Sequence, residues 1–182
     1  NLKGDGNHKL EMDYTISRDY TLNKKLIITT RRTLTITKDT TLTIDNKGEL
    51  ILEEGADIKS EATMLNDAGE VVGVSDDGTV DITLVGGGKF TNKNLGDGSD
   101  YELKRDYTVP VNYKLRNNLK IPKDRTLTVP DSVELIVPNS ITLTIEKGGT
   151  LKDSSNNLQL IGGTLIDENL DGNEIGKEHT LE

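Results

Sequence analysis

Apolar residues recur along this chain in pairs two positions apart, and the pairs repeat with a step of eight residues. The first block consists of Leu26/Ile28, Leu34/Ile36, Leu42/Ile44 and Leu50/Leu52. A second block lies 93 residues further along and consists of Leu119/Ile121, Leu127/Val129, Leu135/Val137 and Leu143/Ile145. Because residues i and i+2 point to the same side of a strand, each pair predicts a short strand with one apolar side.

The residues between the pairs favour strands and corners over helices. Many are Thr, which is β-branched, and Pro122, Pro130 and Pro138 stand eight residues apart, each directly after an apolar position. Proline at these intervals opposes a helix and suits a chain that leaves a strand. Three octads make one coil of 24 residues around a narrow aliphatic interior. The sequence therefore predicts an all-β fold, a right-handed parallel β-helix (β-solenoid) with about 24 residues per coil, in which Leu26 and Leu50 stack on adjacent coils.

The two blocks indicate an imperfect tandem duplication within a single solenoid domain. We place the internal copies at about 1–93 and 94–180. A second match, between DYTISRDYT at 13–21 and DYELKRDYT at 100–108, has an offset of 87 instead of 93. The difference predicts a six-residue insertion in the second copy, near residues 109–116. Recurrence of Arg-Asp-Tyr in both copies favours a structural role for that motif, because a catalytic group is normally needed only once.

Two segments depart from the octad pattern. Residues 59–81 lose it and contain the turn signals Asp67-Ala68-Gly69 and Asp76-Asp77-Gly78, which predict a hairpin or a lateral loop excursion. Leu181-Glu182 is a pair often left by a cloning site, and we leave it out of the interpretation.

Two Gly-Gly segments carry a family resemblance. LVGGGKFTN at 84–92 and LQLIGGTLIDEN at 158–169 resemble the I-x-G-G-x-[IL]-x-x-x-N turn of the pectin-lyase-like superfamily of right-handed parallel β-helices, which includes polygalacturonases, pectate lyases and many bacterial surface proteins. With its repeats the resemblance covers nearly the whole chain, and it implies the fold. The N-T-D, G-H-G and R-I-K motifs of the polygalacturonases are missing, and Asp76-Asp77 is the only pair of their D-D type. The resemblance is therefore to a non-enzymatic, surface-protein type, and we assign no catalytic residue.

The charge and amino-acid composition of the chain exclude several classes of function and site. The chain has 182 residues, 22 basic and 31 acidic side chains and a net charge of -9, which opposes nucleic-acid binding because phosphate contacts need a cationic face. It has no Cys, which excludes disulfides and thiolate metal sites. No apolar run approaches the roughly 20 residues of a membrane-spanning helix, so we expect no membrane insertion. With no Trp and one Phe, the core is expected to be thin and aliphatic.

Two groups of residues are candidates for binding. Tyrosine rings stack on sugars, so the candidate carbohydrate-binding residues are Tyr14, Tyr20, Tyr101, Tyr107 and Tyr113. The segment from Asp167 to Glu178 fits the oxygen-rich spacing D-x-[DN]-x-[DN]-G-x5-E of a calcium loop. Its candidate Ca2+ ligands are Asp167, Asn169, Asp171 and Glu178, and Ca2+ is the one cofactor that the sequence suggests. Asn, Asp and Gly are also ordinary turn formers, so a purely structural loop stays open as the alternative.

These observations lead to three hypotheses. The first is a non-enzymatic structural or adhesive β-helix module of a secreted bacterial cell-surface protein, which contacts an extracellular glycan or a host or matrix surface and continues into further domains of a larger protein. The second is a carbohydrate-binding module, assisted by Ca2+. The third is a polysaccharide lyase or glycoside hydrolase, which requires carboxylates clustered within about 10 Å on one face.

Overall fold

The computed structural model describes residues 7–37, 40–60, 64–65, 71–73, 81–84, 89–131, 133–153 and 155–170. In these residues the chain is all-β, and its parallel strands stack as a β-solenoid of about five turns with about 23 residues per turn. The one helical element described is a 3-10 turn, η1 (Lys93–Leu95). The predicted fold class is confirmed. The chain forms two compact units, Asn1–Asn94 (unit 1) and Leu95–Glu182 (unit 2), each described below by itself.

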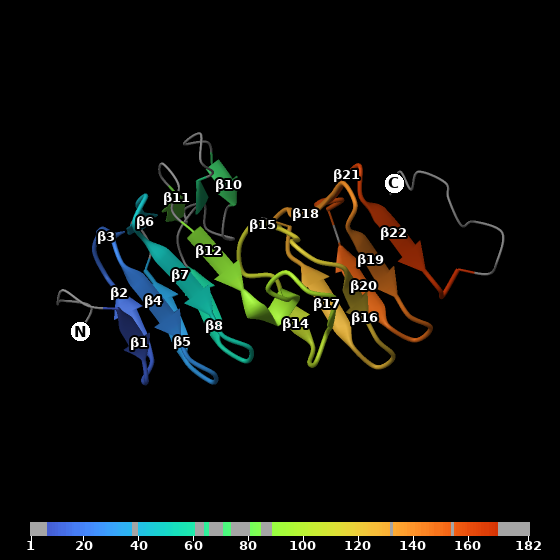
Figure 1. Ribbon diagram of the computed structural model, residues 1–182, viewed down its shortest axis with the longest axis horizontal. Helices are drawn as coiled ribbons and strands as arrows, with labels where there is room; N and C mark the ends of the chain where they lie inside the picture. Colours follow the sequence, from blue (N-terminus) through green and yellow to red (C-terminus); the bar gives the residue numbers. More distant parts are fainter. Residues whose placement is uncertain are drawn as a thin grey trace. The chain divides into compact units, whose positions relative to one another are not determined.

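Unit 1 is built from three sheets whose strands stack from coil to coil (Figure 1). Its first sheet has the order β1-β4-β7-β12 and the second the order β2-β5-β8, and both are parallel. In the third, β3, β6 and β11 are parallel neighbours. The bounds are β1 (His8–Leu10), β2 (Tyr14–Ile16), β3 (Tyr20–Leu22), β4 (Lys25–Ile28), β5 (Thr33–Ile36), β6 (Thr41–Ile44), β7 (Glu49–Leu52), β8 (Asp57–Ser60), β11 (Asp81–Leu84) and β12 (Lys89–Asn92).

Two further strands lie beside β11, within the segment that loses the octad. These are β9 (Met64–Leu65) and β10 (Val71–Gly73), which pair with each other antiparallel. Strand β9 also pairs with β11 through Thr83 and Leu65. The third sheet therefore runs β10-β9-β11-β6-β3, and the strand pair extends it to one side. The residues of 59–81 that lie between these strands, including the Asp76-Asp77 pair, are outside the described residues.

Unit 2 has the regular three-faced arrangement throughout (Figure 1). Its sheets have the orders β13-β16-β19-β22, β14-β17-β20 and β15-β18-β21, all parallel. The bounds are β13 (Tyr101–Glu102), β14 (Tyr107–Thr108), β15 (Tyr113–Lys114), β16 (Leu119–Ile121), β17 (Thr126–Val129), β18 (Leu135–Pro138), β19 (Thr142–Ile145), β20 (Thr150–Asp153), β21 (Leu158–Ile161) and β22 (Thr164–Asp167).

The interior of each unit is a set of aliphatic ladders. Leu26 on β4 pairs in register with Leu50 on β7, and Leu119 pairs with Leu143 in the same way. All four side chains have 0% exposure. Burying a leucine contributes about 1.5 to 3 kcal/mol, so a column of them stabilises stacking without aromatic residues. The predicted stacking of Leu26 on Leu50 is confirmed.

Each unit begins with a coil smaller than the octads predict. The strands of these first coils start six residues apart, at His8, Tyr14 and Tyr20 in unit 1. In unit 2 they start at the positions 93 residues later: Tyr101, Tyr107 and Tyr113. The offset between the units is therefore 93 from the first coil as far as β8 and β20, and the predicted six-residue insertion near 109–116 is wrong. The offset of 87 arose because two strands of one hexad coil resemble each other.

Aspartate and asparagine side chains link each first coil to the next. Asp13 Oδ1 accepts a hydrogen bond from the backbone N of Thr33 (3.0 Å), and Asp19 Oδ1 accepts one from Thr41 N (2.8 Å). In unit 2, Asp106 accepts from Thr126 N (2.9 Å). Each carboxylate satisfies a backbone donor at the start of a longer strand. Both Asp19 and Asp106 belong to Arg-Asp-Tyr, so the motif serves the fold, as the duplication indicates.

Several corners use a left-handed backbone. In unit 2 positive φ angles occur at Asp124 (61°), Ser140 (66°), Gly148 (88°) and Asn156 (56°), which are spaced by multiples of eight, and also at Gly96, Gly98 and Gly162. Gly, Asn and Asp adopt this conformation at low cost, which explains the short polar residues between strands.

Candidate functional site: a polar groove on unit 2

A groove of about 480 Å³ lies on the first sheet of unit 2, across β13, β16 and β19. The pairing register makes two rows on this sheet: Asp100, Asn118 and Thr142 form one, and Glu102, Lys120 and Thr144 form the other. The groove lining consists of these six residues and Tyr101. Side chains two apart on a strand face the same way, so both rows present hydrogen-bonding groups to the same outer surface. The groove is open to solvent, and it offers carboxylate, amide, hydroxyl, ammonium and aromatic groups together.

Hydrogen bonds fix one row of the groove. Asn118 Nδ2 donates to Asp100 Oδ1 (3.0 Å), and Asn118 Oδ1 accepts from the backbone N of Thr142 (2.8 Å). The side chain of Asn118 thus bridges three successive strands. Asp100 and Asn118 thus join successive coils, as the Asp side chains of the first coils do. Their role in the groove is structural.

Two charged groups of the groove lie in the other row, which consists of Glu102, Lys120 and Thr144. Lys120 Nζ lies 3.4 Å from Glu146 Oε1, and the side chain of Lys120 is 56% exposed, so its ammonium group still faces water. Lys104 Nζ lies 5.6 Å from the centroid of the Tyr101 ring, which places a second cation beside the groove. Glu102 is exposed. The groove lining therefore combines carboxylate and ammonium groups on a surface of mixed charge.

The equivalent face of unit 1 has the same backbone pattern and different side chains. Tyr101, Glu102 and Asn118 correspond to His8, Lys9 and Lys25, 93 residues earlier. The remaining four lining residues also differ: Asp100 corresponds to Asn7, Lys120 to Ile27, Thr142 to Glu49 and Thr144 to Ile51.

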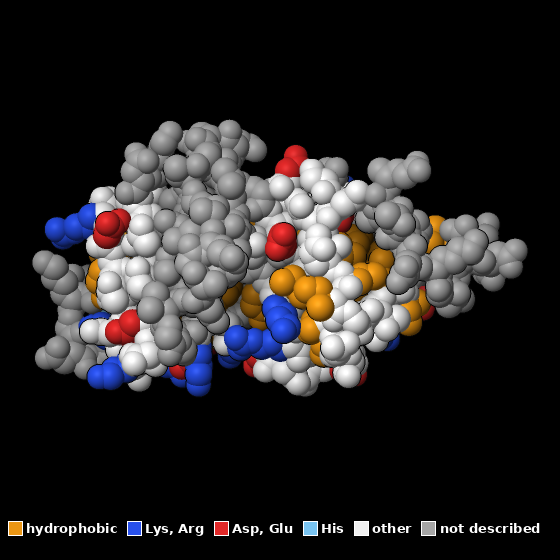
Figure 2. Space-filling view, turned by 90° about the horizontal axis from the view of Figure 1, so that it is seen from above, with side chains coloured by type: hydrophobic (Ala, Val, Ile, Leu, Met, Phe, Trp, Pro, Cys, Tyr) orange, Lys and Arg blue, Asp and Glu red, His pale blue; other side chains and the backbone are white. Residues whose placement is uncertain are grey.

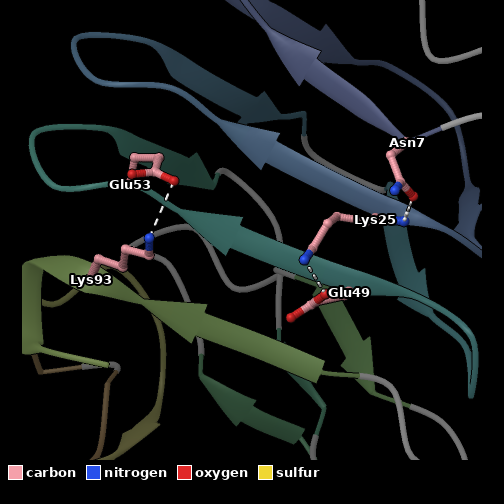
Figure 3. A network of polar contacts seen from close by, with 5 residues as sticks. All are labelled: Asn7, Lys25, Glu49, Glu53 and Lys93. Carbon is pink, nitrogen blue, oxygen red and sulfur yellow. Dashed lines mark hydrogen bonds and ion pairs between the residues drawn. The ribbon is translucent and has the colours of Figure 1, made fainter. Parts of the chain in front are cut away.

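Ion pairs cross the face of unit 1 (Figure 3). Lys25 Nζ lies 2.9 Å from Glu49 Oε2, and Lys93 Nζ lies 3.4 Å from Glu53 Oε1. The fold that the two units share therefore does not require the groove residues of unit 2.

The structure places the five candidate tyrosines at related positions. All begin strands of the two first coils, and each pairs in register with an inward leucine: Leu34, Leu42, Leu119, Leu127 and Leu135. Tyr107 and Tyr113 are 4% and 5% exposed, which leaves almost no ring surface for a sugar. Tyr14, Tyr20 and Tyr101 are half-buried, and of the five only Tyr101 lines the groove.

Tyr20 has a raised pKa. Burial raises the pKa of its hydroxyl above the ordinary value of 10.0, and Tyr14 adds to the rise. Both effects disfavour the phenolate. The neutral form of Tyr20 is therefore favoured.

Two of the four candidate calcium ligands are described, and they hydrogen-bond within a corner. Asp167 Oδ1 accepts from Asn169 N (2.9 Å) and Asn169 Nδ2 (2.8 Å). Asn169 Oδ1 accepts from the backbone N of Gly148 (2.7 Å), and its Nδ2 donates to Gly149 O (3.2 Å). The other two candidates, Asp171 and Glu178, lie outside the described residues.

Unit 1 ends in the same corner. Asn92 Oδ1 accepts from Asn94 N (3.1 Å) and Asn94 Nδ2 (3.2 Å). Asn94 Oδ1 accepts from Gly55 N (2.8 Å), and its Nδ2 donates to Ala56 O (3.1 Å). Because Asn92 takes the position of Asp167, this corner needs an acceptor oxygen and no negative charge. The geometry of Asp167 and Asn169 is thus explained by the fold, and it agrees with the structural alternative for this loop.

Within the described residues, no group of three or more His, Asp or Glu side chains is placed to hold a metal ion. In the same part of the chain, no helix has the length and apolar character needed to cross a bilayer.

The groove itself was not predicted from the sequence. Its rows come from strands that start at residues 101, 119 and 142, and they align only because the first coil has a six-residue step. The signal was present as Asx-aromatic dipeptides at six-residue spacing: Asp13-Tyr14, Asp19-Tyr20, Asp100-Tyr101, Asp106-Tyr107 and Asn112-Tyr113.

Comparisons of the chain with protein-family models, with curated proteins and with solved structures found no match.

Proposed function

We propose that the protein is a non-enzymatic structural and adhesive module of a secreted bacterial cell-surface protein, and that the groove on unit 2 is its contact with an extracellular glycan. The observation that carries the proposal is the difference between the two equivalent faces. Duplicated scaffolds retain what folding needs, so residues that one copy alone carries are candidates for function.

The chemistry of the groove suits a sugar chain. Thr142 and Thr144 offer hydroxyl groups, and Lys120 and Glu102 offer charged partners for the hydroxyl groups of a sugar. Strand spacing of about 4.8 Å along each row matches a ligand that extends across successive coils. Parallel β-helices of the pectin-lyase-like type, which the Gly-Gly segments resemble, supply the expectation of an extracellular bacterial setting.

The carboxylates of the groove do not favour the lyase or hydrolase alternative. Of the two carboxylates in its lining, Asp100 is hydrogen-bonded to Asn118, in a contact of the kind that ties other first-coil residues to the next coil. Paired acid chemistry needs a second carboxylate beside Glu102 that is free to accept or donate a proton. The proposal therefore assigns Glu102 to binding.

A glycan-array screen of the intact chain tests the proposal. We expect one class of glycan to bind, with binding lost in Lys120→Ala and retained in Lys9→Ala, which removes an exposed lysine from the equivalent face of the other unit. Absence of binding to every glycan contradicts the adhesive role. Binding that disappears with a chelator supports the calcium-assisted alternative, and shortening of the bound glycan supports the enzymatic one.

A further inference from the structure

The outward rows of the groove continue onto the next strand of the sheet, β22. Thr142 pairs in register with Thr164, and Thr144 pairs with Ile166. Leu143, which stands between the two threonines of β19, has 0% exposure and points into the core. Because side chains alternate along a strand, Thr164 and Ile166 lie on the same outer surface as the groove, one strand beyond its lining.

The row that starts at Glu102 changes in character along the solenoid. In the order β13, β16, β19 and β22, it consists of Glu102, Lys120, Thr144 and Ile166. The first two side chains are charged, the third has a hydroxyl group, and the fourth is apolar and 37% exposed. Figure 2 shows apolar side chains at the surface toward the right of the view, where Figure 1 places β21 and β22. A ligand that follows the row therefore meets an apolar surface at its end.

The same row of unit 1 has a different arrangement. In the order β1, β4, β7 and β12, it consists of Lys9, Ile27, Ile51 and Thr91. Thr91 takes the position of Ile166, because β12 and β22 are each the fourth strand of their sheet. The fold therefore accepts threonine at this position, and it does not require an exposed isoleucine there.

An exposed isoleucine beside hydrogen-bonding groups is suited to recognise a methyl group. Neighbouring strands lie about 4.8 Å apart, so Thr144 and Ile166 face neighbouring parts of one ligand. A methyl group against Ile166 removes apolar surface from water, while Thr144 hydrogen-bonds to a polar group beside it. A hydroxyl group in the same place would lose its bonds to water without a partner on Ile166. The row thus discriminates between a methyl group and a hydroxyl group.

We propose that the glycan bound along this row carries a methyl-bearing substituent, and that Ile166 recognises the methyl group. Two kinds of sugar supply such a group: amino sugars that are N-acetylated, and 6-deoxy sugars. The inference rests on the proposed glycan-binding function of the groove, and it adds the class of sugar that the groove selects.

Pairs of glycans that differ at the methyl group test the proposal with the intact chain. Trimers of N-acetylglucosamine and of N-formylglucosamine differ by one methyl group per sugar, and L-fucose has a methyl group where L-galactose has a hydroxymethyl group. Isothermal titration calorimetry compares the two members of each pair. We expect the methyl-bearing member of one pair to bind at least about threefold more tightly, because burial of one methyl-sized group corresponds to about a fourfold change in affinity. The pair that shows this difference identifies the source of the methyl group.

The other outcomes separate this inference from the glycan proposal. A smaller difference in both pairs, or binding of other glycans alone, overturns the inference and leaves the glycan proposal standing. Absence of binding to every glycan on the array overturns both.

Ile166→Thr gives the row the residue that unit 1 carries at the equivalent position. We expect this variant to bind the preferred glycan no more tightly than its methyl-free partner, and to bind that partner as the original chain does. Ile161→Thr is the matched control, because Ile161 is 58% exposed and lies on β21, in another sheet. A preference that survives Ile166→Thr, or that Ile161→Thr also abolishes, overturns the proposal.

Saturation-transfer difference NMR of the original chain needs no variant, so it decides the question even where Ile166→Thr does not fold. We expect the methyl protons of the bound glycan to receive the strongest saturation, because they lie against Ile166. Strongest saturation at the ring protons overturns the proposal.

Discussion

Asp106 Oδ1 accepts a hydrogen bond from the backbone N of Thr126, twenty residues further along the chain and one coil away, at 2.9 Å. Asn112 makes the same contact with Glu134 N (2.8 Å), and Asn118 makes it with Thr142 N (2.8 Å). Amide and carboxylate oxygens are therefore interchangeable at these positions. The function of the side chain is to accept a backbone hydrogen bond at the start of the paired strand in the next coil.

Replacing Asp106 tests this role. Asp106→Ala should lower the free energy of unfolding by about 1 to 2 kcal/mol, because the N–H of Thr126 loses its acceptor, whereas Asp106→Asn should be nearly neutral. Urea unfolding measures both, and Asp131→Ala at an exposed corner is the control. An Asn variant as unstable as the Ala variant would mean that charge, and not the acceptor, matters.

The aliphatic ladder predicts a large cost for truncation. Leu127 has 0% exposure and pairs with Tyr107 below and Leu151 above. Leu127→Ala should lower the free energy of unfolding by about 2 to 5 kcal/mol, because a narrow core collapses poorly around a cavity. Thr128→Ala, on the outward side of the same strand, should change it by less than about 1 kcal/mol. Similar costs for both variants would contradict the assigned inward and outward sides.

The two equivalent corners should respond differently to the same substitution. Asn94 is 2% exposed and its Nδ2 donates to Ala56 O, so Asn94→Asp buries a charge and leaves that carbonyl without its donor. We expect a loss of about 2 to 4 kcal/mol in the free energy of unfolding. Asn169→Asp removes the same bonds at an exposed site and should cost clearly less. Chemical denaturation of both variants compares them, and a larger cost at Asn169 would contradict the equivalence.

Tyr20 predicts a loss of stability at alkaline pH. Burial raises its pKa in the folded state above 10.0, with Tyr14 adding to the rise. A raised folded-state pKa means that its contribution is fully present below the unfolded pKa of about 10 and is lost as the pH rises through the folded value.

Titration of tyrosinate absorbance, with parallel unfolding experiments at each pH, measures this effect. Tyr20→Phe should remove the raised pKa and reduce the alkaline loss, and Tyr14→Phe should lower the pKa of Tyr20. A Tyr20 that ionises at or below 10 would contradict the assignment.

Much of the fold was predictable because it depends on short-range periodicity. The i, i+2 pairs identify strands, and the constant step of eight sets the coil, as the pairing of Leu26 with Leu50 confirms. The hexad coils were missed because their i, i+2 pairs begin with Tyr or His instead of an aliphatic residue, as in Tyr14/Ile16, and follow a step of six. Asp13-Tyr14 and Asp19-Tyr20 carry the six-residue signal instead, and it depends on polar contacts that become evident only when the coils are stacked.

The groove was less predictable than the fold. Five tyrosines were candidates for binding, and the sequence does not reveal that Tyr107 and Tyr113 are buried whereas Tyr101 lines an open surface. Glu102, Lys120 and Thr144 lie up to 42 residues apart in the sequence and form one row through parallel pairing. Such a row follows from the register of three strands, and the register depends on the size of the first coil.

The most direct test of the account exchanges one face for the other. Glu102→Lys, Lys120→Ile and Thr144→Ile together place the residues of unit 1 on unit 2, at positions whose backbone pairing is the same in both units. Glycan binding is measured for this triple variant and for the original chain, with circular dichroism as the check on the fold. The account predicts that the variant keeps its β structure and loses binding. A folded variant that binds the same glycan as before would contradict it.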